Sequence, residues 1–148
     1  MKTSIALAIA VVALILAPLV AGPPAAAATK PKPQCEQTTI VQIENYFAND
    51  PSSGIVVVFG SHLGVAQFKD DNGKPMQATI VDRFAEKTAP IYRVRTGDSV
   101  KLCLTEVPQR DSSCNPAKDY RGRIYSAYDS RLGTSFGGAN ANHMCGGA

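Results

Sequence analysis

The chain has 148 residues, of which 45% are hydrophobic, 18% charged and 7% aromatic, with no tryptophan and a formal net charge of +3. This length corresponds to one modest domain, and the small positive charge argues against a dedicated nucleic-acid binder, which normally carries a strongly basic stripe. Four cysteines and two histidines are too few for most multi-metal chemistry.

The chain begins with the pattern of a secretory signal peptide. Lys2 supplies a positive charge, an unbroken apolar run extends from Ile5 to Leu16, and small residues occupy 25–28. This combination is typical of a segment removed on export, and we expect cleavage after Ala28. The alternative is a permanent anchor, but Pro18 interrupts the run, which is shorter than the roughly 20 residues of a spanning helix. We therefore expect a secreted or periplasmic protein without a transmembrane anchor after processing.

Removal of residues 1–28 leaves 120 residues, and because one lysine goes with them, the formal charge becomes +2. Residues 29–34, which include Lys-Pro-Lys-Pro, are typical of an extended, solvated leader. The remaining residues, 35–148, are predicted to form a single disulfide-stabilised β domain.

The cysteines all lie beyond the predicted cleavage site. They are Cys35, Cys103, Cys114 and Cys145. In an oxidising compartment an even number of cysteines usually forms disulfides. Of the three possible pairings we favour Cys103 with Cys114, which closes a short loop, and Cys35 with Cys145, which ties the ends of the domain. A metal site is less favoured, because no C-x-x-C occurs and only His62 and His143 could assist; we expect no cofactor.

The pattern after Cys35 is one of short apolar or β-branched runs separated by turn residues. The candidate strands are 38–43, 54–60, 65–69, 77–81, 90–95, 99–104, 123–128 and 133–136. Residues 70–75 give a strong hairpin-turn signal, and only 81–87 could form a helical turn. About seven or eight short strands predict an all-β fold, a small antiparallel sandwich or barrel-like domain with two disulfides.

The segment 91–104 can be analysed further as a hairpin. A three-residue loop at 97–99 brings the large apolar residues to one face and Arg93, Arg95 and Lys101 to the other. Arg95 then stands opposite Lys101, and like charges in that position are destabilising. Solvent, a carboxylate from the loop at 110–111, or an anionic partner could compensate. The face is therefore either a solvated polar surface or a surface that binds an anion or a partner.

The segment 119–131 is rich in arginine and tyrosine. As a strand it places Arg121, Arg123 and Tyr125 on one side. Arginine and tyrosine are enriched at binding hot spots, so this side could be a recognition surface. The alternative is the charged outer face of an ordinary strand, with nearby aspartates as local ion-pair partners.

Motifs for catalysis and metal binding are incomplete. Residues 133–137 match G-x-S-x-G, but the hydrolase motif needs a strand-to-helix turn and a later acid, and no Asp or Glu follows Asp129. His143, Met144 and Cys145 are nearly adjacent, so they cannot easily converge on copper. Residues 70–73 resemble a calcium loop but lack its ligand spacing and are expected to form a turn.

These patterns favour an exported binding protein over an enzyme. The expected partner is a protein or an anionic envelope or extracellular polymer, contacted through Arg121, Arg123 and Tyr125, with Arg93, Arg95 and Lys101 as a possible extension. An inhibitor or immunity-type role is one form of this hypothesis. A small secreted hydrolase that uses a histidine and an acid is the second hypothesis, and a metal carrier is the third.

Overall fold

The computed structural model describes residues 32–84 and 86–147, so the predicted signal peptide lies outside the described residues. The strands are β1 (Gln34–Phe47), β2 (Asp50–Phe59), β3 (Thr79–Asp82), β4 (Ser99–Glu106), β5 (Ile124–Asp129) and β6 (Thr134–Ala139), and one short 3-10 helix, η1 (Pro90–Arg93), lies between β3 and β4. Lys32 and Pro33 have no regular structure, whereas Gln34, the last residue of the predicted leader, begins β1. None of the described helical structure is long and apolar enough to cross a membrane.

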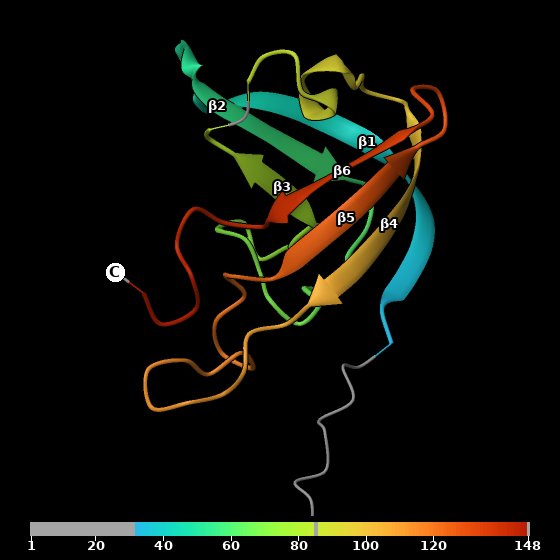
Figure 1. Cartoon of the computed structure of the whole chain (residues 1–148). Coiled ribbons are helices and arrows are strands. Elements are labelled where there is room, and N and C mark those ends of the chain that lie inside the picture. The colour runs from blue at the N-terminus through green and yellow to red at the C-terminus, as the bar shows by residue number, and fades with distance from the viewer. Residues whose placement is uncertain (1–31, 85, 148) are drawn as a thin grey trace, which may run out of the picture. The chain divides into compact units, whose positions relative to one another are not determined.

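The six strands form one antiparallel sheet in the order β1-β2-β3-β6-β5-β4, which closes because β4 also pairs with β1 (Figure 1). The predicted all-β fold is confirmed, and of its two expected forms the barrel is the one present. The first half of β1, from Gln34 to Thr39, pairs with β4, and its second half, from Ile40 to Phe47, pairs with β2. One long strand therefore closes the barrel.

Two of the predicted strands are absent from the described structure, so the prediction of seven or eight strands is wrong. Residues 65–67 lie in a turn and Lys69 forms only an isolated β-bridge with Pro75, while residues 90–93 form η1. Pro90 occupies the start of η1, where its missing N–H costs nothing, and Ile91 is buried in the core. The predicted hairpin over 91–104 therefore does not form, and the neighbours of β4 are β1 and β5.

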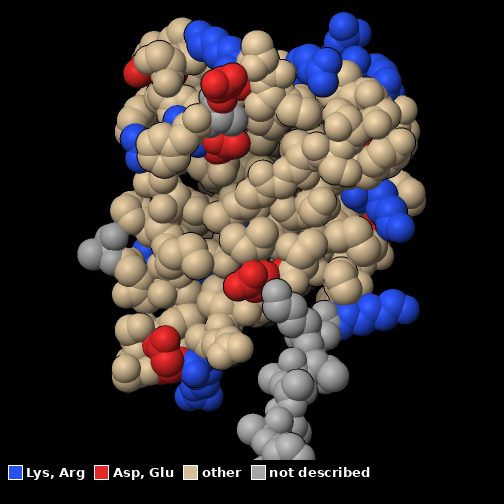
Figure 2. All heavy atoms as spheres, viewed as in Figure 1, with Lys and Arg blue, Asp and Glu red and all other residues tan. Residues whose placement is uncertain are grey.

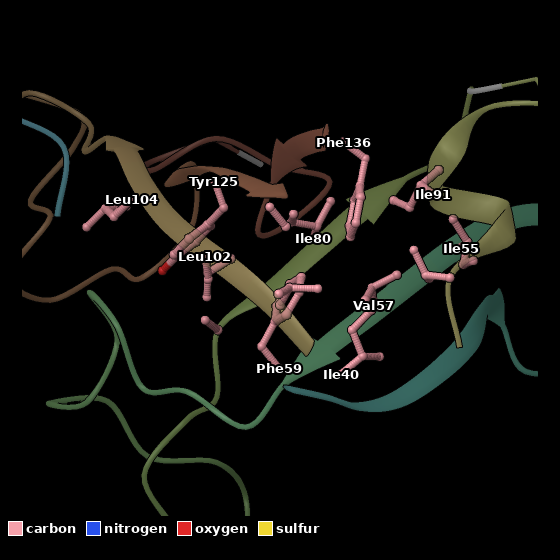
Figure 3. Close-up of a cluster of buried hydrophobic side chains, with 14 of the residues drawn as sticks. Ile40, Ile55, Val57, Phe59, Ile80, Ile91, Leu102, Leu104, Tyr125 and Phe136 are labelled. Atoms are coloured by element: carbon pink, nitrogen blue, oxygen red, sulfur yellow. The ribbon is translucent and has the colours of Figure 1, made fainter. Parts of the chain in front are cut away.

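The core is built from the inward-facing residues of alternating strand positions. It includes Ile40, Val57, Phe59, Ile80, Val100, Leu102, Tyr125, Ala127 and Phe136, most of which Figure 3 shows converging inside the barrel. The rings of Phe59 and Phe136 stack with centroids 6.4 Å apart. Burial of such side chains is the main favourable contribution to folding, at about 1.5–3 kcal/mol for each large residue.

The predicted disulfide pairing is wrong, although two disulfides are present. Cys35 is bonded to Cys103, with their Cα atoms 4.0 Å apart, and Cys114 to Cys145, with Cα atoms 5.2 Å apart. The first bridge forms because Cys35 and Cys103 stand directly opposite each other on β1 and β4. The second joins the long loop after β4 to the C-terminal tail. Two disulfides are compatible with an extracellular location.

Candidate functional site

The arginine and tyrosine face predicted on 121–125 does not exist as a surface. Tyr125 is 1% exposed because the inward side of β5 carries Tyr125 and Ala127, and Arg123, which directly precedes β5, is 2% exposed. The Tyr125 hydroxyl donates to the backbone oxygen of Leu63 at 2.6 Å, and burial raises the pKa of Tyr125 to about 12. Alternation fixes which residues share a side of a strand but not which side faces the core.

Arg121 and Arg123 stabilise the loop before β5. The Arg123 guanidinium donates to the backbone oxygens of Asp119 and Pro116 at 3.0 and 2.8 Å, and its Cζ lies 5.0 Å from the ring centroid of Phe68. Arg121 pairs with the Asp119 carboxylate at 2.8 Å, and this guanidinium holds the pKa of Asp119 well below its usual range. Both arginines are therefore committed to contacts within the fold.

The three basic residues of the predicted hairpin face lie on separate parts of the chain. Arg93 ends η1, Arg95 lies in the segment before β4, and Lys101 lies on β4 opposite Gln37 and Tyr128. The predicted Arg95–Lys101 opposition is wrong, although all three cations are exposed. In Figure 2, the middle of the visible face carries little charge, and Lys and Arg lie mainly towards its margins.

The residues considered for catalysis lie on open segments. His62 and His143 are both exposed, and the hydrogen bond of His62 Nδ1 is with the backbone oxygen of Met76 at 2.7 Å. Ser135 of the G-x-S-x-G match lies exposed within β6, without a strand-to-helix turn. Residues 70–74 form the expected turn, with the Asp70 carboxylate accepting from the N–H of Asn72 and Lys74.

The largest exposed aromatic group lies elsewhere, at the tip of the β1–β2 hairpin. We call Tyr46, Phe47, Arg83 and Phe84 the hairpin-tip cluster. Phe84 is 88% and Phe47 55% exposed. The Arg83 Cζ lies 4.8 Å from the ring centroid of Tyr46 and 5.7 Å from those of Phe47 and Phe84. Tyr46 and Phe47 pack edge to face, with centroids 4.9 Å apart. Three aromatic rings thus surround one cation at the surface.

An irregularity in strand pairing builds this tip. Asn45 pairs with Ile55 and Phe47 with Asp50, so the four residues 51–54 of β2 stand opposite one residue of β1. Such bulges bend a strand and redirect its side chains. The Asp50 carboxylate fixes the bulge by accepting from the N–H and hydroxyl of Ser52, and these hydrogen bonds lower the pKa of Asp50.

Gly54 brings the fourth member of the cluster to the hairpin. Its φ is +111°, and a Cβ on it would lie 2.4 Å from the backbone oxygen of Asp82 and 2.6 Å from the Cα of Arg83. The segment after β3 therefore crosses the hairpin at a point where any side chain would block it. The Asp82 carboxylate accepts from the N–H of Phe84 at 3.0 Å, which turns the chain and presents the Phe84 ring.

An open groove of about 290 Å³ adjoins the cluster. One wall is formed by residues 81–84, and the other by Gly138, Ala139, Ala141 and Asn142. The groove lies where β3 and β6 pair through one residue pair, Val81 with Ala139.

One local feature of the sequence points to the hairpin tip. Residues 49–53, Asn-Asp-Pro-Ser-Ser, are typical of a turn, and Tyr46 and Phe47 precede them by one residue, Ala48. The candidate strands end at 43 and begin again at 54, so both aromatic residues fall between them. The proximity of Arg83 is a tertiary contact that local pattern does not predict.

Comparison with family models, with curated proteins and with solved structures gives no match.

Proposed function

We propose that this protein is an exported, non-enzymatic binding protein that contacts another protein through the hairpin-tip cluster. The observation that carries the proposal is the exposure of Phe47 and Phe84 around Arg83. A grouped set of aromatic rings left in water is a favourable contact surface, since each ring contributes on the order of 1.5–3 kcal/mol when it is fully buried. Tyrosine, phenylalanine and arginine are also the residue types enriched at protein interfaces.

The composition of the cluster favours a protein over an anionic polymer. Recognition of a polyanion depends on several cations arranged along the chain of charges, whereas the cluster has one arginine among three rings. The other exposed cations considered above, Arg93, Arg95 and Lys101, lie on different elements. An anionic polymer would therefore find a mainly apolar surface at the hairpin tip, with Arg83 among the rings and Lys87 near enough to Asp50 to help lower its pKa.

A pair of matched double variants tests the proposal. Phe47→Ser with Phe84→Ser removes the apolar surface of the cluster, and Val107→Ser with Met144→Ser removes two other exposed apolar side chains. Val107 follows β4, whose Leu104 pairs with Gln34 at the start of β1, so it lies at the other end of β1 from Phe47. All four positions are at least 44% exposed, so neither double variant should alter the thermal midpoint strongly.

The measurement is affinity purification of partners from the native extracellular medium with the mature protein as bait. We expect the wild type and the Val107/Met144 variant to retain the same protein partner, and the Phe47/Phe84 variant to lose it. Retention of every partner by a folded Phe47/Phe84 variant would show that the contact surface lies elsewhere.

A further inference from the structure

Arg83 is in contact with three aromatic rings, whereas two other arginines are fixed by ion pairs. Within the residues that the structure describes, those ion pairs join Arg121 to Asp119 and Arg131 to Asp98. The Nε of Arg83 is buried without a hydrogen-bond partner. The guanidinium contacts three aromatic rings instead.

These rings hold the cation in place without neutralising its charge. Cation–π contacts orient a guanidinium and partly remove it from water, but they leave its hydrogen-bond donors unused. A carboxylate binds the planar guanidinium through charge-assisted hydrogen bonds. Such a pair strengthens when neighbouring apolar groups displace water, and Phe47 and Phe84 supply those groups.

The groove beside Arg83 has the form expected for an extended segment. Asp82, Arg83 and Phe84 line it together with Gly138 and Ala139. The space beside the Gly138 Cα is filled by Ile80 and the Val81 backbone oxygen, so the methyl side chain of Ala139 is the short group that lets a second backbone approach this wall. A segment lying there would bring one side chain to Arg83 and a neighbouring one to Phe84. Recognition would then require an acidic residue next to an apolar residue.

We propose that Arg83 binds the carboxylate of an acidic side chain in an extended segment of the protein partner, while Phe84 contacts an adjacent apolar side chain. The inference rests on the proposed function and adds the chemistry of the recognised segment. A single arginine matches the single charge of a carboxylate, and the rings match the aliphatic neighbour. Specificity therefore comes from an acidic–apolar pair of residues.

Two blocked peptides that differ in one group test the role of the carboxylate. The probes are acetyl-Leu-Glu-Leu-amide and acetyl-Leu-Gln-Leu-amide, titrated to about 10 mM into ¹⁵N-labelled mature protein, a range suited to weak binding. The readout is the Nε–Hε resonance of Arg83 together with the backbone amides of residues 138 and 139. We expect the Glu peptide to shift these resonances and to bind about threefold more tightly than the Gln peptide, a ratio typical of a partly exposed ion pair.

The variants separate this inference from the proposed function. Arg83→Gln should bind the two peptides equally, and Arg110→Gln, which changes an exposed arginine on the β4–β5 loop, should discriminate as the wild type does. Equal binding of the two peptides by the wild type, or no shift with the Glu peptide, would overturn the role of Arg83. A partner that is lost with Phe47→Ser/Phe84→Ser but bound with unchanged Kd by Arg83→Gln would refute this inference and leave the proposed function standing.

Discussion

Gly54 lies against the backbone of Arg83, so closely that a Cβ at this position would stand 2.6 Å from the Arg83 Cα. The β2 strand and the segment after β3 are therefore in contact at the one place where β2 has no side chain. This contact positions the Arg83 guanidinium among the rings of the β1–β2 hairpin.

We predict that Gly54→Ala destabilises the protein and displaces Arg83. The matched control is Gly97→Ala, because Gly97 also has a positive φ, +92°, but a Cβ there would meet nothing within 4 Å. Gly97→Ala should cost about 1–2 kcal/mol from backbone conformation alone. Gly54→Ala should cost clearly more and shift the Arg83 Nε–Hε resonance. Urea unfolding measures both costs, and equal values would contradict the close contact.

We predict that Arg123→Met lowers the free energy of unfolding by about 3 kcal/mol, because it leaves the backbone oxygens of Asp119 and Pro116 without their donor. Arg93→Met, which changes an exposed side chain on η1, should have an effect within about 0.5 kcal/mol. Chemical denaturation distinguishes the two. If both variants changed the free energy of unfolding by a similarly small amount, the buried position of Arg123 would be contradicted.

We predict that Asp98 makes stability depend on pH in the acid range. The Arg131 guanidinium, bonded to Asp98 at 2.7 and 2.8 Å, lowers the pKa of this carboxyl to about 2, below the value of about 3.9 in an unfolded chain. The stabilisation, about 2 kcal/mol, is therefore complete above about pH 5 and is lost progressively as the pH falls through about 2.

The substitution Asp98→Asn should remove this dependence. Unfolding free energies measured from neutral pH to about pH 2 should show the difference between wild type and Asp98→Asn shrinking as the pH falls. Asp71→Asn, at an exposed turn, should leave the slope unchanged. A constant difference between wild type and Asp98→Asn across the range would argue against the ion pair.

We predict that each disulfide stabilises the protein by about 4 kcal/mol in the chain-entropy model, since the bridges span separations of 68 and 31 residues. The double variants Cys35→Ser/Cys103→Ser and Cys114→Ser/Cys145→Ser remove one bridge each and leave no unpaired thiol. Unfolding curves give the costs, and peptide mapping of the unreduced protein checks the connectivity. Recovery of a peptide joining Cys103 to Cys114 would refute the described pairing.

The fold class could be predicted because β-strands can be recognised from the pattern of neighbouring residues. The apolar run bounded by glycines at 54–60 and the turn at 70–75 both lie where the pattern placed them, since period and turn chemistry are local properties. The strand predicted at 90–95 is wrong. Apolar and polar residues alternate there as in a strand, but Pro90 and the burial of Ile91 favour a 3-10 turn.

The candidate site was harder to predict because it depends on contacts distant in sequence. Arg123 and Tyr125 share one side of the chain, as predicted. Which side faces inward is decided by the closure of the barrel, and it is the side of Tyr125 that is buried. In the same way, Cys35 meets Cys103 because β1 closes the sheet on β4. The short loop between Cys103 and Cys114 had favoured a bond between those two cysteines, which is not the pairing in the structure.

The two disulfides also determine how the protein would bear a mechanical load. Tension applied between Cys35 and Cys145 passes across the first bridge to Cys103, along residues 103–114, and across the second bridge from Cys114. The segments 36–102 and 115–144 are bypassed, so β2, β3, β5 and β6 carry no tension through their own backbone. Stretching the chain between these two cysteines would therefore pull on residues 103–106 at the end of β4 and on the loop to Cys114, while the hairpin tip, which lies in a bypassed segment, would bear no load.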